Sequence, residues 1–489
     1  MSDLGTGTVI GLEVHVRLAT VTKLFCGCPA VFGASPNSRV CPMCLGLPGA
    51  LPTLNGDAVR LAVRAALALG YRVERTSEFV RKQYFYPDLP KGYQITQYAH
   101  PLARQGSLRV PDAAGGRRVP LRRLQLEEDA GKSVHDQLES SSLLDFNRCG
   151  LPLIEIVTEP VLRSPSEARA FLVRLRQVLE RYARVSDCRM EEGELRADAN
   201  ISLVDSGGVT RAGRVEVKNL NSFAHVERAL AVEERRLAAR VAEGHAPGAE
   251  TRLYDAEARK TRALRGKEEV LDYRYMPEPD LPPLRIDEAS LRAAADGLPP
   301  APAEVERRLI EHHGLSPQEA ARIANTPGRA AYLEATVADG GLPLARTASG
   351  LVLGQLAAER KRRGLESEAD LLPPAALRRL AQLRLDGRLS ARTAARALEL
   401  LFRLREPSPS DVDELVASRQ LTQVAEPAEL ERWIRQALAA HPGEVERYRA
   451  GEERLLGYFM GEVMRASSGR ADPRAATLLL RALLRSAEG

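Results

Sequence analysis

Residues 195–203 (Leu-Arg-Ala-Asp-Ala-Asn-Ile-Ser-Leu) and residues 214–218 (Arg-Val-Glu-Val-Lys), with a Gly-Gly pair between them, decide how this chain folds. In both segments apolar and polar residues alternate with the period of a half-buried β-strand, and the two glycines are typical of a hairpin turn. A sheet with one face in water would explain the alternation by itself. Acidic and amide residues are poor strand formers, however. A polar face that carries Asp198, Glu216 and Lys218 is therefore better explained if it holds a cation and an anion.

Length and composition narrow the class of protein. The chain has 489 residues, which predicts two to four domains, and its 44% hydrophobic and 28% charged residues are typical of a soluble globular protein. Aromatic residues make up only 4%, which argues against base stacking as the main mode of recognition, and a net charge of +5 gives no general basic field. No apolar run is long enough for a membrane span and no secretory signal opens the chain. We therefore expect a cytoplasmic protein.

A second candidate strand lies near the N-terminus, at residues 7–18, where polar and apolar residues again alternate. Glu13 and His15 fall on one face of this strand, because side chains two residues apart point the same way. A carboxylate and an imidazole so placed can share a cation. An exposed, salt-bridged pair is the alternative that this stretch leaves open.

Two short cysteine pairs predict a metal site. Cys26 and Cys28 are separated by one residue, and Cys41 and Cys44 by two, with a loop between the pairs. Paired thiolates at tight turns suit a tetrahedral zinc ion, and a site with four thiolates is closed, so its role is folding rather than catalysis. The alternative is a set of reduced thiols left from an ancestral site.

An acidic segment follows in residues 124–133 (Leu-Gln-Leu-Glu-Glu-Asp-Ala-Gly-Lys-Ser). Its Gly-Lys-Ser ending suggests a P-loop, but Leu126 occupies the position of the first glycine, and the acids would repel phosphate. Glu127, Glu128 and their neighbour Asp129 suit magnesium instead, with Lys132 beside them as a cation for phosphate. A solvated acidic turn is the alternative. Further on, Glu155 interrupts a buried-type strand and is either paired or functional.

Residues 81–94 are unusual because three tyrosines and two lysines crowd together in a chain poor in aromatics. Such a segment, which includes Lys82 and Tyr84, suits a loop that grips a nucleotide or an acceptor end by cation contact and stacking. An ordinary tyrosine-rich packed loop explains the composition as well. From about residue 291 the chain becomes rich in Ala, Leu, Arg and Glu with helical spacing. Its arginines form either a solvated face or a surface for a phosphate backbone.

Taken together, the first half offers a set of acids and one histidine as candidate metal ligands and catalytic groups, with three lysines as phosphate cations. The candidate ligands are Glu13, His15, Glu127, Glu128, Asp198 and Glu216, and the lysines are Lys82, Lys132 and Lys218. We add Tyr84 and Asn219 as candidate nucleotide contacts. The set predicts a magnesium-nucleotide site on a sheet that is neither a P-loop nor a Rossmann fold, with phosphoryl transfer as its chemistry.

Eight blocks along the chain resemble the signature blocks of the GatB family, the B subunits of tRNA-dependent amidotransferases. They are residues 11–15 (Gly-Leu-Glu-Val-His), 84–88 (Tyr-Phe-Tyr-Pro-Asp), 127–133, 152–157 (Pro-Leu-Ile-Glu-Ile-Val), 190–193 (Met-Glu-Glu-Gly), 198–202 (Asp-Ala-Asn-Ile-Ser), 218–223 (Lys-Asn-Leu-Asn-Ser-Phe) and 272–275 (Asp-Tyr-Arg-Tyr). The similarity covers essentially the whole chain, and the spaced blocks together are highly specific.

The resemblance implies an α+β protein with three parts. A mainly antiparallel-sheet catalytic cradle domain with the four-cysteine zinc site would span residues 1–293. An all-α helical domain would follow over residues 294–406, and a small all-α tail of the YqeY-like type over residues 407–489. The two helical parts would contact tRNA.

The activity implied by the resemblance is ATP-dependent phosphorylation of the side-chain carboxylate of Glu on tRNA(Gln) or of Asp on tRNA(Asn). Ammonia then displaces phosphate to give the amide. The ammonia would come from glutamine hydrolysed by a partner A subunit, with a small C subunit holding the pair. Two other classes remain open: a non-catalytic, zinc-bearing tRNA-binding subunit, and a free-standing carboxylate–ammonia ligase.

Carried over residue by residue, the resemblance assigns Glu13, His15, Glu128 and Glu216 to the family's Mg²⁺ site. It places Glu127 and Asp198 close by. The four cysteines match the zinc-binding subset of the family. Whether Asp-tRNA(Asn), Glu-tRNA(Gln) or both are amidated does not follow from the sequence.

Overall fold

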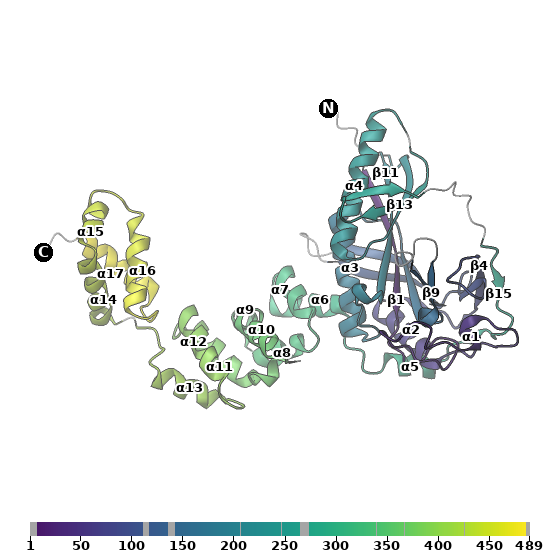
Figure 1. Cartoon of the computed structure of the whole chain (residues 1–489). Coiled ribbons are helices and arrows are strands. Elements are labelled where there is room, and N and C mark those ends of the chain that lie inside the picture. The colour runs from purple at the N-terminus through teal and green to yellow at the C-terminus, as the bar shows by residue number, and fades with distance from the viewer. Residues whose placement is uncertain are drawn as a thin grey trace. The chain divides into compact units, whose positions relative to one another are not determined.

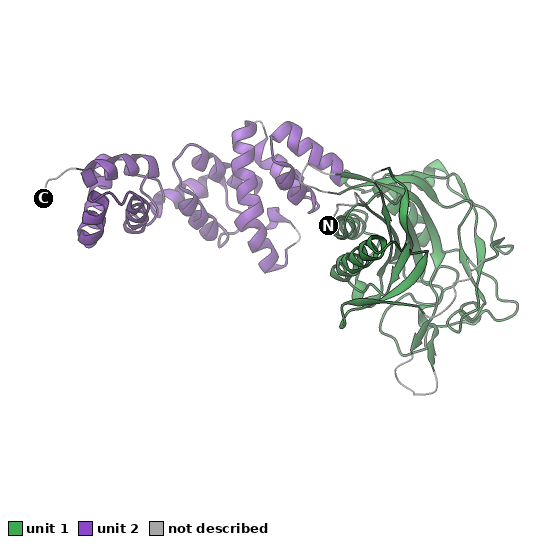
Figure 2. Ribbon diagram, turned by 90° about the horizontal axis from the view of Figure 1, so that it is seen from above, with its two compact units in different colours: residues 1–301 green, residues 302–489 purple. Residues whose placement is uncertain are grey.

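The computed structural model divides the chain into two compact units, Met1–Ala301 and Pro302–Gly489, which are green and purple in Figure 2. The residues that the structure describes are 7–110, 117–134, 142–205, 207–245, 247–264, 273–338, 340–365, 367–424 and 426–485. Within them, no helix combines the length and the apolar character that a membrane span needs. Each unit is described separately below.

Unit 1 is built on a large twisted sheet, whose nine described strands run in the order β14-β13-β12-β11-β1-β10-β7-β6-β2. Neighbouring strands are antiparallel except β12 and β13, which are parallel. The strands are β1 Gly7–Arg17, β2 Arg72–Val73, β6 Ala103–Val110, β7 Arg117–Glu128, β10 Pro152–Thr158, β11 Leu195–Val204, β12 Thr210–Lys218, β13 Glu250–Asp255 and β14 Lys260–Ala263. The hairpin predicted around residue 207 is present as β11 and β12.

The alternation of residue types gives the sheet one apolar and one polar face. Leu12, Val14 and Val16 of β1 are buried in the core, together with Ala197 and Ala199 of β11. The intervening residues of these strands point to the opposite face, because the side-chain period of a strand is two. Helices cover the apolar face, and the polar face is left for the candidate site.

Unit 1 contains five α-helices in its described residues, of which α2, α3 and α4 pack on the large sheet, with α3 and α4 side by side in Figure 1. They are α1 Pro42–Leu45, α2 Gly56–Ala68, α3 Pro165–Gln177, α4 Phe223–Ala242 and α5 Glu288–Ala295. Ser164 caps α3 by accepting a hydrogen bond from the backbone N–H of Glu167. Helix α3 ends at Gln177, and the π-helical segment Val178–Tyr182 continues it.

Unit 1 also has three smaller sheets within its described residues. Their strands are β3 Thr76–Ser77, β4 Val80–Gln83, β5 Tyr93–Thr96, β8 Lys132–Val134, β9 Leu143–Asp145, β15 Met276–Pro277 and β16 Leu284–Arg285. Strand β5 is tied to the end of β7, because Thr96 donates a hydrogen bond to Glu127 at 2.9 Å and Gln94 donates one to the carbonyl of Glu128 at 2.6 Å. The sheet β15-β4-β5 therefore lies against the edge of the polar face.

Every regular element that the structure describes in unit 2 is a helix. They are α6 Pro302–His313, α7 Pro317–Ala324, α8 Arg329–Val337, α9 Gly341–Leu351, α10 Ala357–Arg363, α11 Pro374–Leu385, α12 Ala391–Leu401, α13 Pro409–Ser418, α14 Pro427–Ala440, α15 Pro442–Arg449, α16 Leu455–Ala466 and α17 Pro473–Arg485. An antiparallel sheet followed by helices confirms the predicted α+β class.

The described part of unit 2 has two hydrophobic cores. The first extends to Leu421 and includes Val412 and Val416 of α13. The second is formed by α14, α16 and α17 around Trp433 and Phe459. The sequence predicts a domain boundary after residue 406, but α13 packs on the first core through its two valines, so the cores separate after residue 421.

Candidate active site

Four side chains from three strands meet on the polar face of the large sheet. Glu13 and His15 come from β1, Glu127 from β7 and Glu155 from β10. The imidazole Nε2 of His15 lies 3.3 Å from a carboxylate oxygen of Glu127, 3.6 Å from one of Glu155 and 3.8 Å from one of Glu13. We call these four residues the acidic cluster.

Strand register explains why the cluster forms. His15 is the direct partner of Glu155 on β10 and of Arg196 on β11, and Glu13 is the direct partner of Asp198. Side chains of direct cross-strand partners share a face and have Cβ atoms about 5 Å apart. Residues far apart in the sequence are therefore brought together by the pairing of β1 with its two neighbours.

The electrostatics of the acidic cluster call for positive charge at its centre. Burial by itself would lower the pKa of His15, but hydrogen bonds with Glu127 and Glu155 raise that pKa to about 10. Burial opposes the ionisation of Glu127, yet its hydrogen bond with His15 lowers the pKa of this carboxyl to about 2. Burial, together with the nearby charge of Glu155, raises the pKa of Glu13. The carboxylates thus share one cation, and a divalent metal ion would satisfy them in the same way.

The acidic cluster has the dimensions of a metal site. One ligand atom each from Glu13, His15 and Glu155 lies within 4.8 Å of the others. The ligands of an octahedral Mg²⁺ stand about 2.1 Å from the ion and hence about 3–4 Å apart. The distances from His15 to the three carboxylates fall in that range. The cluster therefore fits a divalent cation that keeps open positions for water and substrate oxygens.

A second polar group lies on the same face. The ammonium of Lys218 is 3.2 Å from Asp198 and 3.0 Å from Glu216, and Thr251 donates a hydrogen bond to Glu216 at 3.0 Å. Burial opposes the charge of this lysine, but the two carboxylates raise its pKa. Glu216 is on β12, two strands from β1, which places its backbone about 10 Å from that of β1. It lies beside the acidic cluster rather than within it.

Lys82 of β4 reaches towards the acidic cluster from the flanking sheet. Its ammonium lies over the ring of Tyr273, 4.7 Å from the centroid, and 6.0 Å from that of Tyr84. Burial would lower the pKa of Lys82, but the carboxylate of Glu127 and the other acidic groups nearby together raise it. Asp272, which opens the last of the eight sequence blocks, lies outside the described residues.

Glu128 points away from the acidic cluster. It follows Glu127 in β7, and successive residues of a strand face opposite sides. Its carboxylate forms an ion pair with Lys91 and accepts a hydrogen bond from the backbone N–H of Ile95 at 2.9 Å. The structure therefore separates Glu128 from Glu13 and His15. Its assignment as a magnesium ligand stays a prediction, and the ion pair with Lys91 argues against it.

Two other predicted contacts lie outside the acidic cluster. Lys132 is exposed in the short strand β8, which pairs with β9. Asn219 follows β12 with a positive φ of 65° and donates a hydrogen bond to the carbonyl of Tyr254 at 3.0 Å. Its side chain thus holds the end of the hairpin against β13.

The four predicted cysteines converge on one point. The Sγ of Cys44 lies 3.6 Å from that of Cys26, 3.7 Å from that of Cys41 and 3.9 Å from that of Cys28. A disulfide would need about 2.05 Å, whereas four sulfurs around tetrahedral zinc lie about 3.8 Å apart. The hydrogen bond from Cys26 and, to a smaller extent, the charge of Lys23 lower the pKa of Cys44 to about 4. The arrangement fits zinc.

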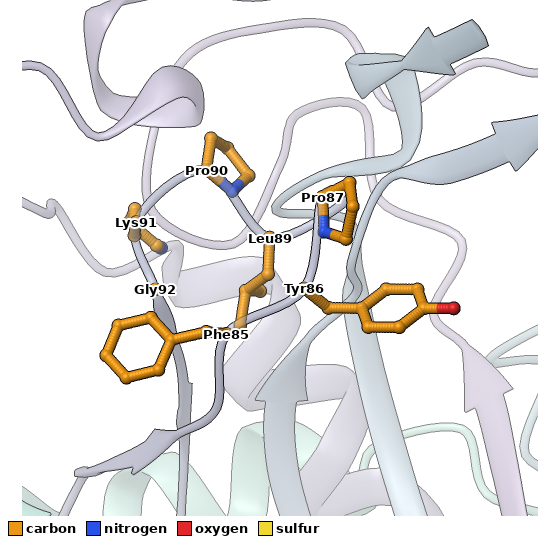
Figure 3. Close-up of a pocket in the computed structure, with 7 residues that line it drawn as sticks. All are labelled: Phe85, Tyr86, Pro87, Leu89, Pro90, Lys91 and Gly92. Atoms are coloured by element: carbon orange, nitrogen blue, oxygen red, sulfur yellow. The ribbon is translucent and has the colours of Figure 1, made fainter. Parts of the chain in front are cut away.

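The loop between β4 and β5 forms an open surface hollow of about 470 Å³. Its lining residues are Phe85, Tyr86, Pro87, Leu89, Pro90, Lys91 and Gly92. Figure 3 shows the rings of Phe85 and Tyr86 pointing to opposite sides of the loop, and Phe85 is 79% exposed. An apolar surface of this kind close to Glu128 is compatible with the predicted gripping loop.

Sequence reasoning left out some of the side chains that surround the acidic cluster. The sequence marks Glu155 as an interruption of a buried-type strand that is either paired or functional, but it does not place this residue among the metal ligands. Arg123, which lies 3.3 Å from Glu155 and 5.8 Å from the ring centroid of Tyr98, was not singled out. Tyr98 stacks on Tyr275 with centroids 4.1 Å apart. Two features of the sequence could have indicated these residues. One is a charged residue, Glu155, inside an apolar strand, and the other is the presence of tyrosines in a chain that has few aromatic residues.

Known proteins resemble this chain along nearly its whole length. The family model of the GatB/GatE catalytic domain matches residues 8–292, and that of the GatB domain matches residues 331–484. A protein of Thermomicrobium roseum is 47% identical over 97% of both chains. One of Thermosynechococcus vestitus is 45% identical over 96% of this chain and 95% of its own, and one of Thermotoga maritima is 41% identical over 97% and 98%.

All three relatives are named as the B subunit of an aspartyl/glutamyl-tRNA(Asn/Gln) amidotransferase. The matched segments include both the sheet that carries the acidic cluster and the helices of unit 2. The resemblance stated from the eight sequence blocks is thereby confirmed. This chain belongs to the GatB family, the B subunits of tRNA-dependent amidotransferases.

Proposed function

We propose that this chain carries the transamidation site for Glu-tRNA(Gln), Asp-tRNA(Asn) or both, and uses ATP to activate the side-chain carboxylate of the esterified amino acid. Family membership along both units supports this reaction. The observation that carries the proposal is the acidic cluster: carboxylates from β1, β7 and β10 held around His15, with Lys82 beside them. Phosphoryl transfer requires this pairing of metal ligands with a phosphate cation.

A carboxylate is a poor acyl donor to ammonia, so it must be activated first. This requirement fixes the order in which bonds form and break. An oxygen of the substrate carboxylate attacks the γ-phosphorus of ATP, and the bond to ADP breaks. Ammonia then attacks the carbonyl carbon of the acyl phosphate, phosphate leaves, and the nitrogen loses a proton as the amide forms. The polar face must therefore hold two anionic substrates, ATP and a carboxylate, close together.

Glu13, His15 and Glu155 would hold the magnesium ion, with Glu127 fixing the imidazole from the side. When bound, Mg²⁺ neutralises charge on the ATP phosphates. Lys82 is placed to contact a phosphate oxygen, since its ammonium is held between tyrosine rings and the acidic cluster. Lys218 would exchange one of its two carboxylate partners for phosphate when ATP binds. The tyrosine-rich surroundings would keep water away from the acyl phosphate.

The partners and cofactors of this proposal follow the family. A glutaminase A subunit would supply ammonia, and a small C subunit would hold the pair together. Zinc at the four cysteines would stabilise the fold of unit 1, because a closed tetrathiolate site has no open position for a substrate. The cytoplasm, where charged tRNA is made, is the compartment that we expect.

Reconstitution tests the proposal against its two alternatives. Purified A and C subunits, glutamine, ATP and either charged tRNA are expected to give amidated aminoacyl-tRNA with one ADP per amide. A non-catalytic tRNA-binding subunit would form amide equally well with Glu13→Gln in place of the unaltered chain. A free-standing ligase would amidate free glutamate or aspartate without RNA or partners. Absence of amide on both tRNAs with the complete complex would refute the proposal.

A further inference from the structure

Lys23 is a buried charge that the reaction does not use. It lies just before the first cysteine pair and is 0% exposed. Its ammonium donates to the carbonyl of Arg39 at 2.9 Å, to the Sγ of Cys44 at 3.4 Å and to the carbonyl of Phe146 at 3.5 Å. Within the described residues, these hydrogen-bond partners of the ammonium are two carbonyls and a sulfur rather than a carboxylate. A buried ammonium is costly unless a negative charge lies near it.

The zinc site is the negative charge within reach. Zinc is bound by cysteine thiolates rather than thiols, so four thiolates around one Zn²⁺ leave two net negative charges. Cys44 is itself buried and contacts the other three sulfurs. A hydrogen bond to a metal-bound thiolate withdraws electron density from that sulfur and fixes its position. The ammonium of Lys23 supplies this hydrogen bond and one compensating charge.

The same lysine connects the zinc site to the large sheet. Its backbone N–H donates to the carbonyl of Cys28 at 2.9 Å, and the N–H of the next residue donates to the carbonyl of Gly150 at 2.8 Å. A Cβ at Gly150 would lie 3.5 Å from the Cδ of Lys23 and 3.9 Å from a carboxylate oxygen of Glu128. Gly150 lies just before β10, the strand that carries Glu155.

A second lysine contacts the cysteine loop from outside without touching a sulfur. Gly46 ends α1 with a φ of +66°, and a Cβ there would approach the Cγ of Lys91 to 2.6 Å. Lys91 uses its ammonium for Glu128 rather than for a cysteine. The two lysines therefore differ in one respect that matters: both are buried beside the zinc loop, but only Lys23 has a thiolate as a partner.

We propose that Lys23 is a positioning residue of the zinc site, which balances part of the charge of the zinc tetrathiolate and fixes Cys44 through an N–H···S hydrogen bond. This role belongs to the metal site and does not depend on the transamidation proposed above. It assigns a function to a buried ammonium that would otherwise face only carbonyl oxygens.

The test compares Lys23→Met with Lys91→Met in the full chain. Competition with a chromogenic chelator is expected to show zinc bound about 10–100-fold more weakly by Lys23→Met. Lys91→Met, which removes a buried ammonium that has no sulfur contact, is expected to bind zinc as the unaltered chain does. Equal zinc affinity of all three proteins would overturn the proposal.

The absorption spectrum of the cobalt-substituted protein tests the N–H···S hydrogen bond directly, because a lysine that only stabilised the fold would not change the charge-transfer bands. In Co²⁺-loaded Lys23→Met, the sulfur-to-cobalt charge-transfer bands are expected to shift to lower energy, because a thiolate without its hydrogen bond gives up electrons more easily. Lys91→Met should keep the bands of the unaltered chain. Bands that do not move in Lys23→Met would contradict the N–H···S bond.

Should Lys23→Met fail to fold, Lys23→Arg and Lys23→Gln replace it. The arginine keeps the charge and is expected to retain zinc, whereas the glutamine keeps N–H donors without the charge and is expected to lose it to the chelator. Equal zinc retention by these two variants, or loss of zinc from both with the fold intact, would overturn the charge-balancing role.

Discussion

Glu155 of β10 lies directly opposite His15 of β1, and its carboxylate oxygen is 3.6 Å from the imidazole Nε2. The same carboxylate also accepts a hydrogen bond from Gln125 at 3.1 Å. Within the acidic cluster, the carboxylate of Glu155 is therefore held by His15 on one side and by Gln125 on the other. Glu128 shares none of these contacts, because its carboxylate is bound to Lys91.

The pair Glu155 and Glu128 gives the first prediction. Glu155→Gln is expected to lower kcat for amidation by at least about 100-fold, because it removes one carboxylate ligand of the magnesium ion, and several kcal/mol of transition-state charge stabilisation depend on that ion. Glutamine hydrolysis by the partner subunit should continue in the same complex. Glu128→Gln is the matched control, and its amidation is expected to fall much less. A larger loss of amidation in Glu128→Gln than in Glu155→Gln would support Glu128, rather than Glu155, as a magnesium ligand.

Magnesium binding can be measured without the reaction. If the acidic cluster holds the ion, Mg²⁺ at one hundred times its Kd should raise the free energy of unfolding by about 2.7 kcal/mol. Thermal unfolding with increasing Mg²⁺ measures the gain, and Glu13→Gln should abolish it. Mn²⁺ is expected to stabilise at lower concentration, because an imidazole is a softer ligand than Mg²⁺ prefers. Unchanged stabilisation in Glu13→Gln would place the ion elsewhere.

The strands and their polar face could be predicted from the sequence because a period of two is a local pattern. The alternation around Asp198 gave β11, and that around His15 gave β1. Which strands are neighbours is not local. The pairing of β1 with β10 depends on long-range hydrogen bonds, and for that reason Glu155 could be noted as unusual without being placed beside His15.

The separation of Glu128 from Glu127 has a simple cause. Adjacent acids in a sequence look equivalent, but one step along a strand reverses the direction of the side chain. Glu127 therefore faces His15, and Glu128 faces Lys91. The cysteine site, in contrast, could be predicted. Two cysteines only one or two residues apart must lie close together in any fold, and in the structure the four sulfurs converge.

Removal of zinc tests the structural role of the cysteine site. Cys44→Ser is expected to lower the zinc content of the chain to less than one ion per chain and to destabilise unit 1, since binding free energy of a structural metal is folding free energy. Cys188→Ala is the matched control: Cys188 is buried but lies outside the four-cysteine group. Metal analysis and thermal unfolding check both variants. Full stability of zinc-free protein would contradict the assignment.

Lys82 and Lys132 are both candidate phosphate cations, and their replacement should affect kcat/KM for ATP to clearly different extents. Lys82 lies beside Tyr273 and near Glu127, whereas Lys132 is exposed in β8. Lys82→Met is therefore expected to lower kcat/KM for ATP by about 100-fold, the size of one lost contact to charge that develops in the transition state. Lys132→Met is expected to change it by less than about threefold. ADP release measured against ATP concentration distinguishes them, and a larger loss in Lys132→Met would show that the nucleotide phosphates lie towards β8 rather than over the acidic cluster.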